Sequence, residues 1–287
     1  RVVPTNVYDR LLFFGVDADL WMEPGVTRAG LEANLGSFYT RGTPPPAGVS
    51  LVLGAGNVVG IGWLDVVHKL FVEGKTVLIK FSRVAEYMGP HFEKAFAELI
   101  AAGYVRVAYG GRADNGEYLT RHPAVTDLHL TGSASSYDAI VWGPDAEGRK
   151  EAGDPIVDKP VTCELGNVSP VIVVGGKWSE RALRLRAEDV ATQVMHNAGY
   201  NCNAARVVVL PEAWPQREAF MGHLRRVLAA LPARAAYYPG AEATYDQYLA
   251  AHDRAEVFGR RERGVLPPTL LPELDPEGDH LIFREEP

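Results

Sequence analysis

From residue 50 onward, short runs rich in β-branched residues alternate with longer segments whose apolar residues recur at helical spacing. This alternation constrains the fold strongly, because consecutive parallel strands must be joined by a crossover connection, usually a helix. Four such runs precede residue 145, at 50–53, 76–81, 105–109 and 126–131. We therefore expect an α/β fold in which a doubly wound parallel sheet carries helices on both faces.

The segments between these runs predict the crossover helices. A helix is expected at 61–71, with Gly74 as its stop. Two further helices are expected at 83–102, interrupted at Pro90, and at 116–122. Residues 144–158 are polar and rich in glycine and proline, which predicts an irregular surface insertion.

A second set of elements is expected after this insertion. Ser179 is placed to cap a helix that ends at Gly199, and Phe220 and Leu224 belong to another amphipathic helix. The tail after it is rich in proline and is expected to be irregular. Strands are predicted at 160–165, 170–174 and 206–210, the second of them buried.

Composition narrows the class of partner. The chain has 29 Lys and Arg against 36 Asp and Glu, a net charge of −7. It therefore lacks the basic excess that neutralises nucleic-acid phosphates or binds an anionic membrane. The most apolar stretch, 51–67, is shorter than the ~20 residues that cross a bilayer. We expect a small-molecule partner, with no nucleic acid and no membrane.

The two cysteines, Cys163 and Cys202, are too few for a disulfide framework or a four-cysteine zinc site. They fit a reducing compartment, most simply the cytoplasm, and leave a thiol for chemistry. The 8 histidines and 36 acidic residues show no spacing typical of metal ligands. No metal is therefore expected.

The glycines after the first strand match the usual dinucleotide-binding pattern only in part. Gly54 and Gly56 are present, but Val59 stands where the third glycine is required. The second strand should also end in an acid that holds a ribose hydroxyl. Here it ends in Lys80, Ser82 and Arg83 instead.

Six short motifs explain these departures. They are Asn57, Lys80, LTGS at 130–133, ELGN at 164–167, GYNCNAAR at 199–206 and REEP at 284–287. In this order, and with 23 positions from Asn57 to Lys80, they resemble the aldehyde dehydrogenase superfamily from about residue 48 to the last residue. The resemblance implies a modified Rossmann doubly wound sheet without the third glycine, followed by a second α/β catalytic domain.

On this resemblance we predict three parts. An N-terminal segment, 1–48, packs on a dinucleotide-binding domain, 49–166, and a catalytic domain that is incomplete at its C-terminus occupies 167–287. The resemblance also implies a longer parent chain that forms a homo-oligomer.

The expected chemistry begins at Cys202. An aldehyde is a poor hydride donor until a nucleophile adds to its carbonyl, and a thiolate can add and later leave. Cys202 lies between two asparagines in a loop, so we predict that it is the nucleophile. Glu164 at a strand end is the predicted general base for thioester hydrolysis, and Asn57 the predicted donor to the oxyanion. Cys163 should point to the opposite face of the strand, into the core.

The resemblance also implies the residues that bind NADP or NAD. Lys80 would bind the adenosine ribose, and Gly132 and Ser133 the diphosphate. Glu286 would hold the nicotinamide ribose. Ser82 and Arg83 follow the second strand, where an arginine suits a 2′-phosphate, so NADP is favoured over NAD.

Some residues depart from the family pattern. Tyr200 replaces the usual glutamine before the nucleophile, Asn167 the second glycine of ELGG, and Tyr137 a glycine after the LTGS turn. Three functions stay open: hydrolytic oxidation of an aldehyde, an acylating reaction that forms or reduces a thioester, and a noncatalytic binding or assembly module. The acylating relatives typically lack the glutamate of ELG, so Glu164 favours hydrolysis.

Overall fold

The computed structural model describes residues 1–40, 42, 46–110 and 113–283, and it divides the chain into two units. The first unit holds residues 1–46 and 72–74. Its helices are α1 (Val7–Leu12), α2 (Arg28–Asn34) and α3 (Ser37–Thr40). Asn6 and Thr27 begin α1 and α2 by accepting hydrogen bonds from the backbone N–H groups of Asp9 and Gly30. The predicted packing of residues 1–48 stays a prediction, as does the three-part division of the chain.

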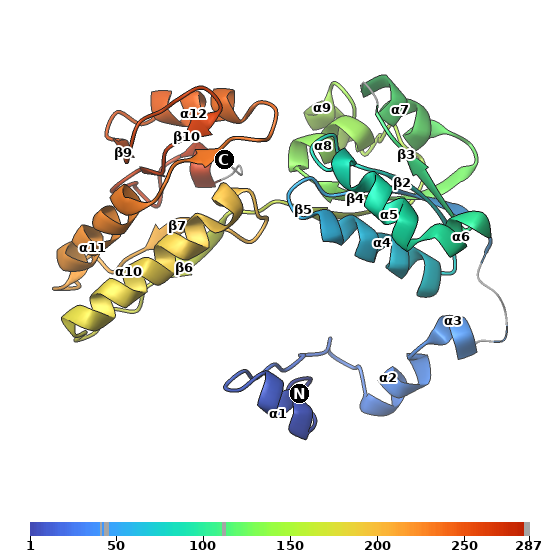
Figure 1. Cartoon of the computed structure of the whole chain (residues 1–287), viewed down its shortest axis with the longest axis horizontal. Coiled ribbons are helices and arrows are strands. Elements are labelled where there is room, and N and C mark those ends of the chain that lie inside the picture. Colours follow the sequence, from blue (N-terminus) through green and yellow to red (C-terminus); the bar gives the residue numbers. More distant parts are fainter. Residues whose placement is uncertain (41, 43–45, 111–112, 284–287) are drawn as a thin grey trace. The chain divides into compact units, whose positions relative to one another are not determined.

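The second unit contains the predicted parallel sheet (Figure 1). Its five strands lie in the order β3-β2-β1-β4-β5, and all four neighbouring pairs are parallel. The strands are β1 (Val49–Leu53), β2 (Thr76–Lys80), β3 (Val105–Ala108), β4 (Val125–Gly132) and β5 (Val161–Leu165). The α/β fold class predicted from the alternating runs is confirmed.

Helices cover both faces of this sheet. They are α4 (Val59–Phe71), η1 (Glu86–Met88), α5 (Gly89–Ala95), α6 (Ala97–Ala101), α7 (Ala113–Arg121), α8 (Ala134–Val141) and α9 (Ala146–Ala152). Val66 of α4 and Phe92 of α5 pack with Val52 and Ile79 in one buried cluster. On the other face, Leu119 of α7 and Ile140 of α8 pack against the cluster that contains Leu51 and Leu128. The sheet is therefore doubly wound.

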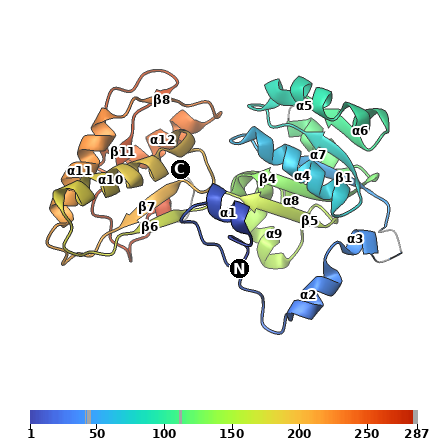
Figure 2. The same ribbon diagram turned by 60° about the horizontal axis from the view of Figure 1, so that its bottom comes forward.

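The residues after the main sheet form a second core. Strands β6 (Ser169–Ile172) and β7 (Ala205–Val209) make a parallel pair. Helices α10 (Glu180–Val194) and α11 (Arg217–Ala230) lie side by side in both views (Figures 1 and 2). Their apolar faces meet through Leu183, Ala187, Phe220 and Leu224. Ser179 caps α10 as predicted, since its Oγ accepts a hydrogen bond from the N–H of Ala182 at 3.2 Å.

Short elements complete the described chain. They are η2 (His196–Gly199), β8 (Arg234–Ala235), α12 (Ala241–Ala250), β9 (Glu256–Val257), β10 (Val265–Leu266), β11 (Thr269–Leu270) and η3 (Leu281–Phe283). Within the described ranges, no helix combines the length and the apolar character that a membrane span needs.

Several expectations are wrong in detail. Residues 144–158 include helix α9, which Gly153 ends with a left-handed φ of 63°. The tail predicted to be irregular contains α12. The strand predicted at 170–174 ends at Ile172, and its side chains alternate between half-buried and exposed. Val171 packs against the second core whereas Ile172 is exposed, so only one face of the strand is covered.

The prediction that Cys163 lies in the core is also wrong. Cys163 is exposed, as are its neighbours Thr162 and Glu164. Strand alternation determines the face to which a side chain points, but that face is buried only where another element covers it. β5 is one of the two outer strands of the described sheet, and the face to which Cys163 points is left uncovered, so alternation alone did not bury the thiol.

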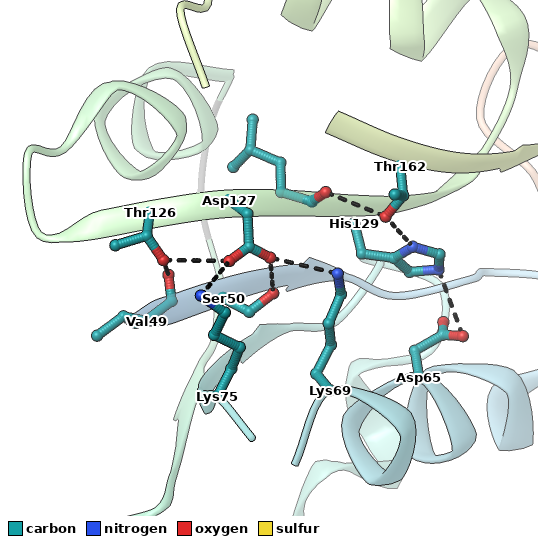
Figure 3. Close-up of polar contacts among 10 residues, drawn as sticks. Val49, Ser50, Asp65, Lys69, Lys75, Thr126, Asp127, His129 and Thr162 are labelled. Atoms are coloured by element: carbon teal, nitrogen blue, oxygen red, sulfur yellow. Dashed lines mark hydrogen bonds and ion pairs between the residues drawn. The ribbon is translucent and has the colours of Figure 1, made fainter. Parts of the chain in front are cut away.

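A group of polar side chains fastens α4 to the sheet (Figure 3). Asp127 on β4 accepts a hydrogen bond from the Ser50 hydroxyl at 2.6 Å and pairs with the Lys69 ammonium at 3.3 Å. Burial raises the pKa of the Asp127 carboxyl, but the Ser50 hydrogen bond and the Lys69 charge outweigh burial and hold it below its ordinary value. Nearby, His129 Nε2 lies 3.4 Å from Asp65 Oδ1 on α4.

Candidate active site

The carboxyl ends of the parallel strands open onto a cavity of about 1150 Å³. From β1 the chain adds β2 and β3 on one side and later β4 and β5 on the other. Such a reversal of strand order leaves a crevice at the strand ends, where α/β proteins bind ligands. Seven of the predicted site residues line the cavity: Asn57, Lys80, Ser82, Gly132, Ser133, Glu164 and Cys202.

Cys202 lies half-buried in the loop between η2 and β7. The N–H of Ala204 donates to the carbonyl of Asn201 at 2.9 Å, which closes a turn around the cysteine. The side chain of Asn167 donates to the Cys202 carbonyl at 2.7 Å. Asn167 also accepts a hydrogen bond from the Ser169 hydroxyl, which orients its amide. The residue that departs from the family's ELGG pattern therefore fastens the loop of the predicted nucleophile.

The chain enters this loop through three residues with left-handed backbone. Asn197, Ala198 and Gly199 have φ values of 52°, 57° and 87°. A non-glycine residue in this region costs about 1–3 kcal/mol, and such strain persists only where the surroundings hold it. His196, just before the turn, is exposed, and its Nδ1 lies 2.9 Å from the Asn201 amide.

Glu164 lies one residue before the end of β5, beside Thr131 of β4 in the parallel register. It is exposed and lines the same cavity as Cys202. Asn167, three residues later, contacts the Cys202 carbonyl, so the ELGN motif and the nucleophile loop meet directly.

Asn57 follows β1 and contacts the nucleophile loop. Its Nδ2 donates to the Tyr200 carbonyl at 2.9 Å, which uses one of the two amide hydrogens. Its Oδ1 accepts a hydrogen bond from the N–H of the next residue, Val58, at 2.8 Å. The side chain therefore contacts its own backbone segment and also reaches the segment that carries Cys202.

Four of the predicted cofactor residues line the cavity: Lys80, Ser82, Gly132 and Ser133. Lys80 ends β2, and its Nζ donates to the Phe81 carbonyl at 3.5 Å. Ser133 caps α8 by accepting a hydrogen bond from the N–H of Ser136 at 3.1 Å. Arg83 is exposed in a turn ahead of η1, so it does not begin a helix there. Glu286 lies outside the described residues.

The glycine loop after β1 accommodates close neighbours. A Cβ on Gly56 would lie 2.8 Å from Ser82 Oγ and would collide with the Tyr238 hydroxyl, whereas one on Gly60 would meet open space. Gly56 is therefore required by the packing of its own neighbours, whereas the open space at Gly60 lets a phosphate approach the backbone closely at the start of α4. With the Lys80 ammonium and the Ser133 hydroxyl on the same lining, these residues fit a dinucleotide.

Three tyrosines form an aromatic cluster that the sequence motifs did not predict. The Tyr200 ring lies 4.7 Å from that of Tyr237 and 5.1 Å from that of Tyr238, between ring centres. Burial raises the pKa of Tyr200 and of Tyr237 above the ordinary value, so both stay protonated near neutral pH. Tyr237 and Tyr238 are adjacent in the sequence, but only tertiary packing places them against Tyr200. Within the described residues, no group of three or more His, Cys, Asp or Glu is placed to hold a metal ion.

Sequence comparison identifies relatives of this chain. A family model described as the aldehyde dehydrogenase family matches residues 33–239. A curated relative, 1-pyrroline-5-carboxylate dehydrogenase 2 of Bacillus subtilis (strain 168), is 24% identical over 256 residues. The match covers 84% of this chain and 48% of the relative, so the chain spans about half the length of that protein.

Two solved structures show the same fold. The NADP-dependent glyceraldehyde-3-phosphate dehydrogenase of Bacillus halodurans C-125, complexed with NADP, superposes with a TM-score of 0.66 at 20% identity, covering 84% of this chain and 50% of that one. An aldehyde dehydrogenase of Mycobacterium tuberculosis, complexed with NAD+, gives a TM-score of 0.66 at 20% identity, covering 85% and 50%.

Proposed function

Because the chain belongs to the aldehyde dehydrogenase family, we propose that it carries the site for NAD(P)-dependent oxidation of an aldehyde to a carboxylic acid. The observation that carries this proposal is the cavity at the strand ends, which Cys202, Glu164 and Asn57 line together. These residues supply a nucleophile, a base and an amide donor, which are the three groups that the reaction requires.

Cys202 acts first, as a thiolate. Its Sγ adds to the aldehyde carbon, and the carbonyl oxygen becomes an oxyanion as the C–S bond forms. Asn57 donates its remaining amide hydrogen to this oxyanion, with the backbone N–H of Cys202 as the second donor. The Asn57 bond to the Tyr200 carbonyl, at 2.9 Å, keeps that amide close to the nucleophile loop.

The second stage releases the acid. When bound, NAD(P)+ would supply the acceptor for the hydride that leaves the thiohemiacetal carbon. Cys202 is then held as a thioester. Glu164 removes a proton from a water molecule, the resulting hydroxide adds to the thioester carbon, and the C–S bond breaks to return the thiolate. Overall, aldehyde, water and NAD(P)+ give carboxylic acid, NAD(P)H and a proton.

Residues on both sides of the point where the strand order reverses would hold the cofactor: Lys80 its adenosine ribose, and Gly132 and Ser133 its diphosphate. Glu286, which lies outside the described residues, would hold the nicotinamide ribose, as the family resemblance implies. Arg83 is exposed beside Ser82 at the end of β2, where a guanidinium suits a 2′-phosphate, so NADP is preferred over NAD. Glu164 favours the hydrolytic reaction over the acylating one.

The test is formation of NAD(P)H by the purified chain with a panel of aldehydes and each oxidised cofactor. Wild type is compared with Cys202→Ala and with Cys163→Ser as the matched thiol control. We expect wild type and Cys163→Ser to form NAD(P)H at equal rates, and Cys202→Ala to form none. If no aldehyde reacts, or if Cys202→Ala keeps its activity, the proposed function is wrong.

A further inference from the structure

Asn197 has no role in the steps above, yet its side chain joins three parts of the site. Its Nδ2 lies 3.0 Å from the Asn57 carbonyl, 3.0 Å from Asn201 Oδ1 and 2.9 Å from the Tyr237 hydroxyl, and each of these oxygens accepts. An amide nitrogen carries two hydrogens, so the three oxygens share them. A single atom therefore connects the segment after β1, the nucleophile loop and the tyrosine cluster.

Each partner of Asn197 stands beside a group that the reaction uses. Asn57 is the proposed donor to the oxyanion, and its backbone carbonyl is the atom that Asn197 holds. Asn201 is buried directly before Cys202. Tyr237 packs its ring against Tyr200, whose carbonyl accepts the Asn57 amide. Asn197 thus fixes the nucleophile loop relative to the oxyanion donor.

The backbone gives an independent reason for such a contact. Asn197 begins the run of three left-handed residues, with φ of 52°, and Ala198 follows at 57°. Asparagine tolerates this region better than other non-glycine residues, but alanine does not. A strained turn of this kind persists only where neighbouring groups stabilise it. The hydrogen bonds from Asn197 provide this stabilisation.

We propose that Asn197 is a positioning residue. Together with its partner Tyr237, it fixes the position of Cys202 relative to Asn57. The inference rests on the proposed function, since it assigns Asn197 to the same reaction. Its effect passes through Asn201 and Asn57, and a displacement of the nucleophile by about 1 Å can cost on the order of 100-fold in rate.

The test compares the two thiols of one molecule. Brief iodoacetamide treatment followed by peptide mapping gives the ratio of Cys202 to Cys163 alkylation, and Cys163, exposed on β5, serves as the internal reference. The ratio is measured for wild type, Asn197→Gly and Tyr237→Phe at pH values from 6 to 9. The temperature is kept well below the unfolding temperature. Asn197→Gly keeps the left-handed backbone without strain and removes the amide. Tyr245→Phe is the matched control, because it loses a hydroxyl contact to Thr269 at 2.7 Å instead.

We expect Cys202 to react at least ~10-fold faster than Cys163 at pH 7 in wild type and Tyr245→Phe, the scale of an activated thiolate. The ratio should fall about tenfold in Asn197→Gly and about threefold in Tyr237→Phe, and its pH profile should approach that of an ordinary cysteine with a midpoint near ~8.5. A merely structural role would change the unfolding temperature and leave the ratio and its pH profile unchanged. If Cys202 of the wild type reacts faster than Cys163 but the ratio is unchanged in Asn197→Gly, this inference alone is wrong. If the two cysteines of the wild type react at equal rates, the proposed function is wrong, and with it the need for positioning.

Discussion

Replacing Asp127 by asparagine removes the carboxylate that fastens α4 to β4 (Figure 3). The Lys69 and Asp127 side chains are only 4% and 12% exposed, and their charged atoms lie 3.3 Å apart. Lys75 approaches the same carboxylate at 4.0 Å, and the Ser50 hydroxyl donates to it at 2.6 Å. The substitution keeps the shape of the side chain but removes one negative charge from beside two ammonium groups.

The expected cost follows from burial. Removing one partner of a buried ion pair costs about 3–5 kcal/mol, because the remaining charge stays out of water. For a protein of this size each kcal/mol shifts the unfolding midpoint by roughly 2–4 °C. The midpoint of Asp127→Asn should therefore fall by roughly 6–20 °C at pH 7.

Thermal unfolding followed by circular dichroism measures this shift, together with Lys69→Met and the double variant. The double variant should lose less stability than the sum of the two single variants, since it removes both members of the pair. Two results would contradict the role of the Lys69–Asp127 pair in holding α4. One is a double variant that loses as much stability as the two single variants added together. The other is an unfolding midpoint of Asp127→Asn within about 2 °C of wild type, which corresponds to less than about 1 kcal/mol.

The dependence on pH gives a second check of the same pair. The folded-state pKa of Asp127 lies below the ordinary value of the unfolded chain, near ~3.9. Its contribution is therefore present above that unfolded value and is lost as the pH falls through the folded pKa. The stability gap between wild type and Asp127→Asn should shrink in acid, and a constant gap from pH 7 to 3 would refute the assignment.

Three further outcomes test the site. Glu164→Gln should spare the first burst of NAD(P)H in stopped-flow experiments and slow steady turnover by ~100-fold or more, whereas unchanged turnover would mean that another base acts. Arg83→Glu should weaken NADP binding and leave NAD binding within a few-fold in fluorescence titrations; equal NADP affinity in both proteins contradicts the 2′-phosphate role. Asn167→Gly should lower the burst rate about tenfold by releasing the Cys202 carbonyl, and a rate within twofold of wild type would assign that hydrogen bond no part in positioning.

Local sequence pattern determined most of the main sheet. The β-branched runs became β1 to β4 because parallel strands buried between two helical layers need apolar residues along their length. Ser179 began α10 for an equally local reason, since a hydroxyl at that position satisfies a backbone N–H of the first turn. The motifs also placed Asn57, Glu164 and Cys202 at strand ends or loops, where the structure has them lining one cavity.

Tertiary structure decided what depends on residues distant in the chain. Strand alternation assigned Cys163 to one face of β5. Whether that face is covered depends on the packing of other elements, and Cys163 is exposed. In the sequence, Asn167 was only a departure from the family's glycine. Its contact with the Cys202 carbonyl, 35 positions away, forms because the pairing of β6 with β7 brings the two segments together. The same holds for Asn197, whose partners Asn57 and Tyr237 lie 140 and 40 positions away. Spacing along a chain records local preferences, whereas hydrogen bonds between loops depend on how the whole chain packs.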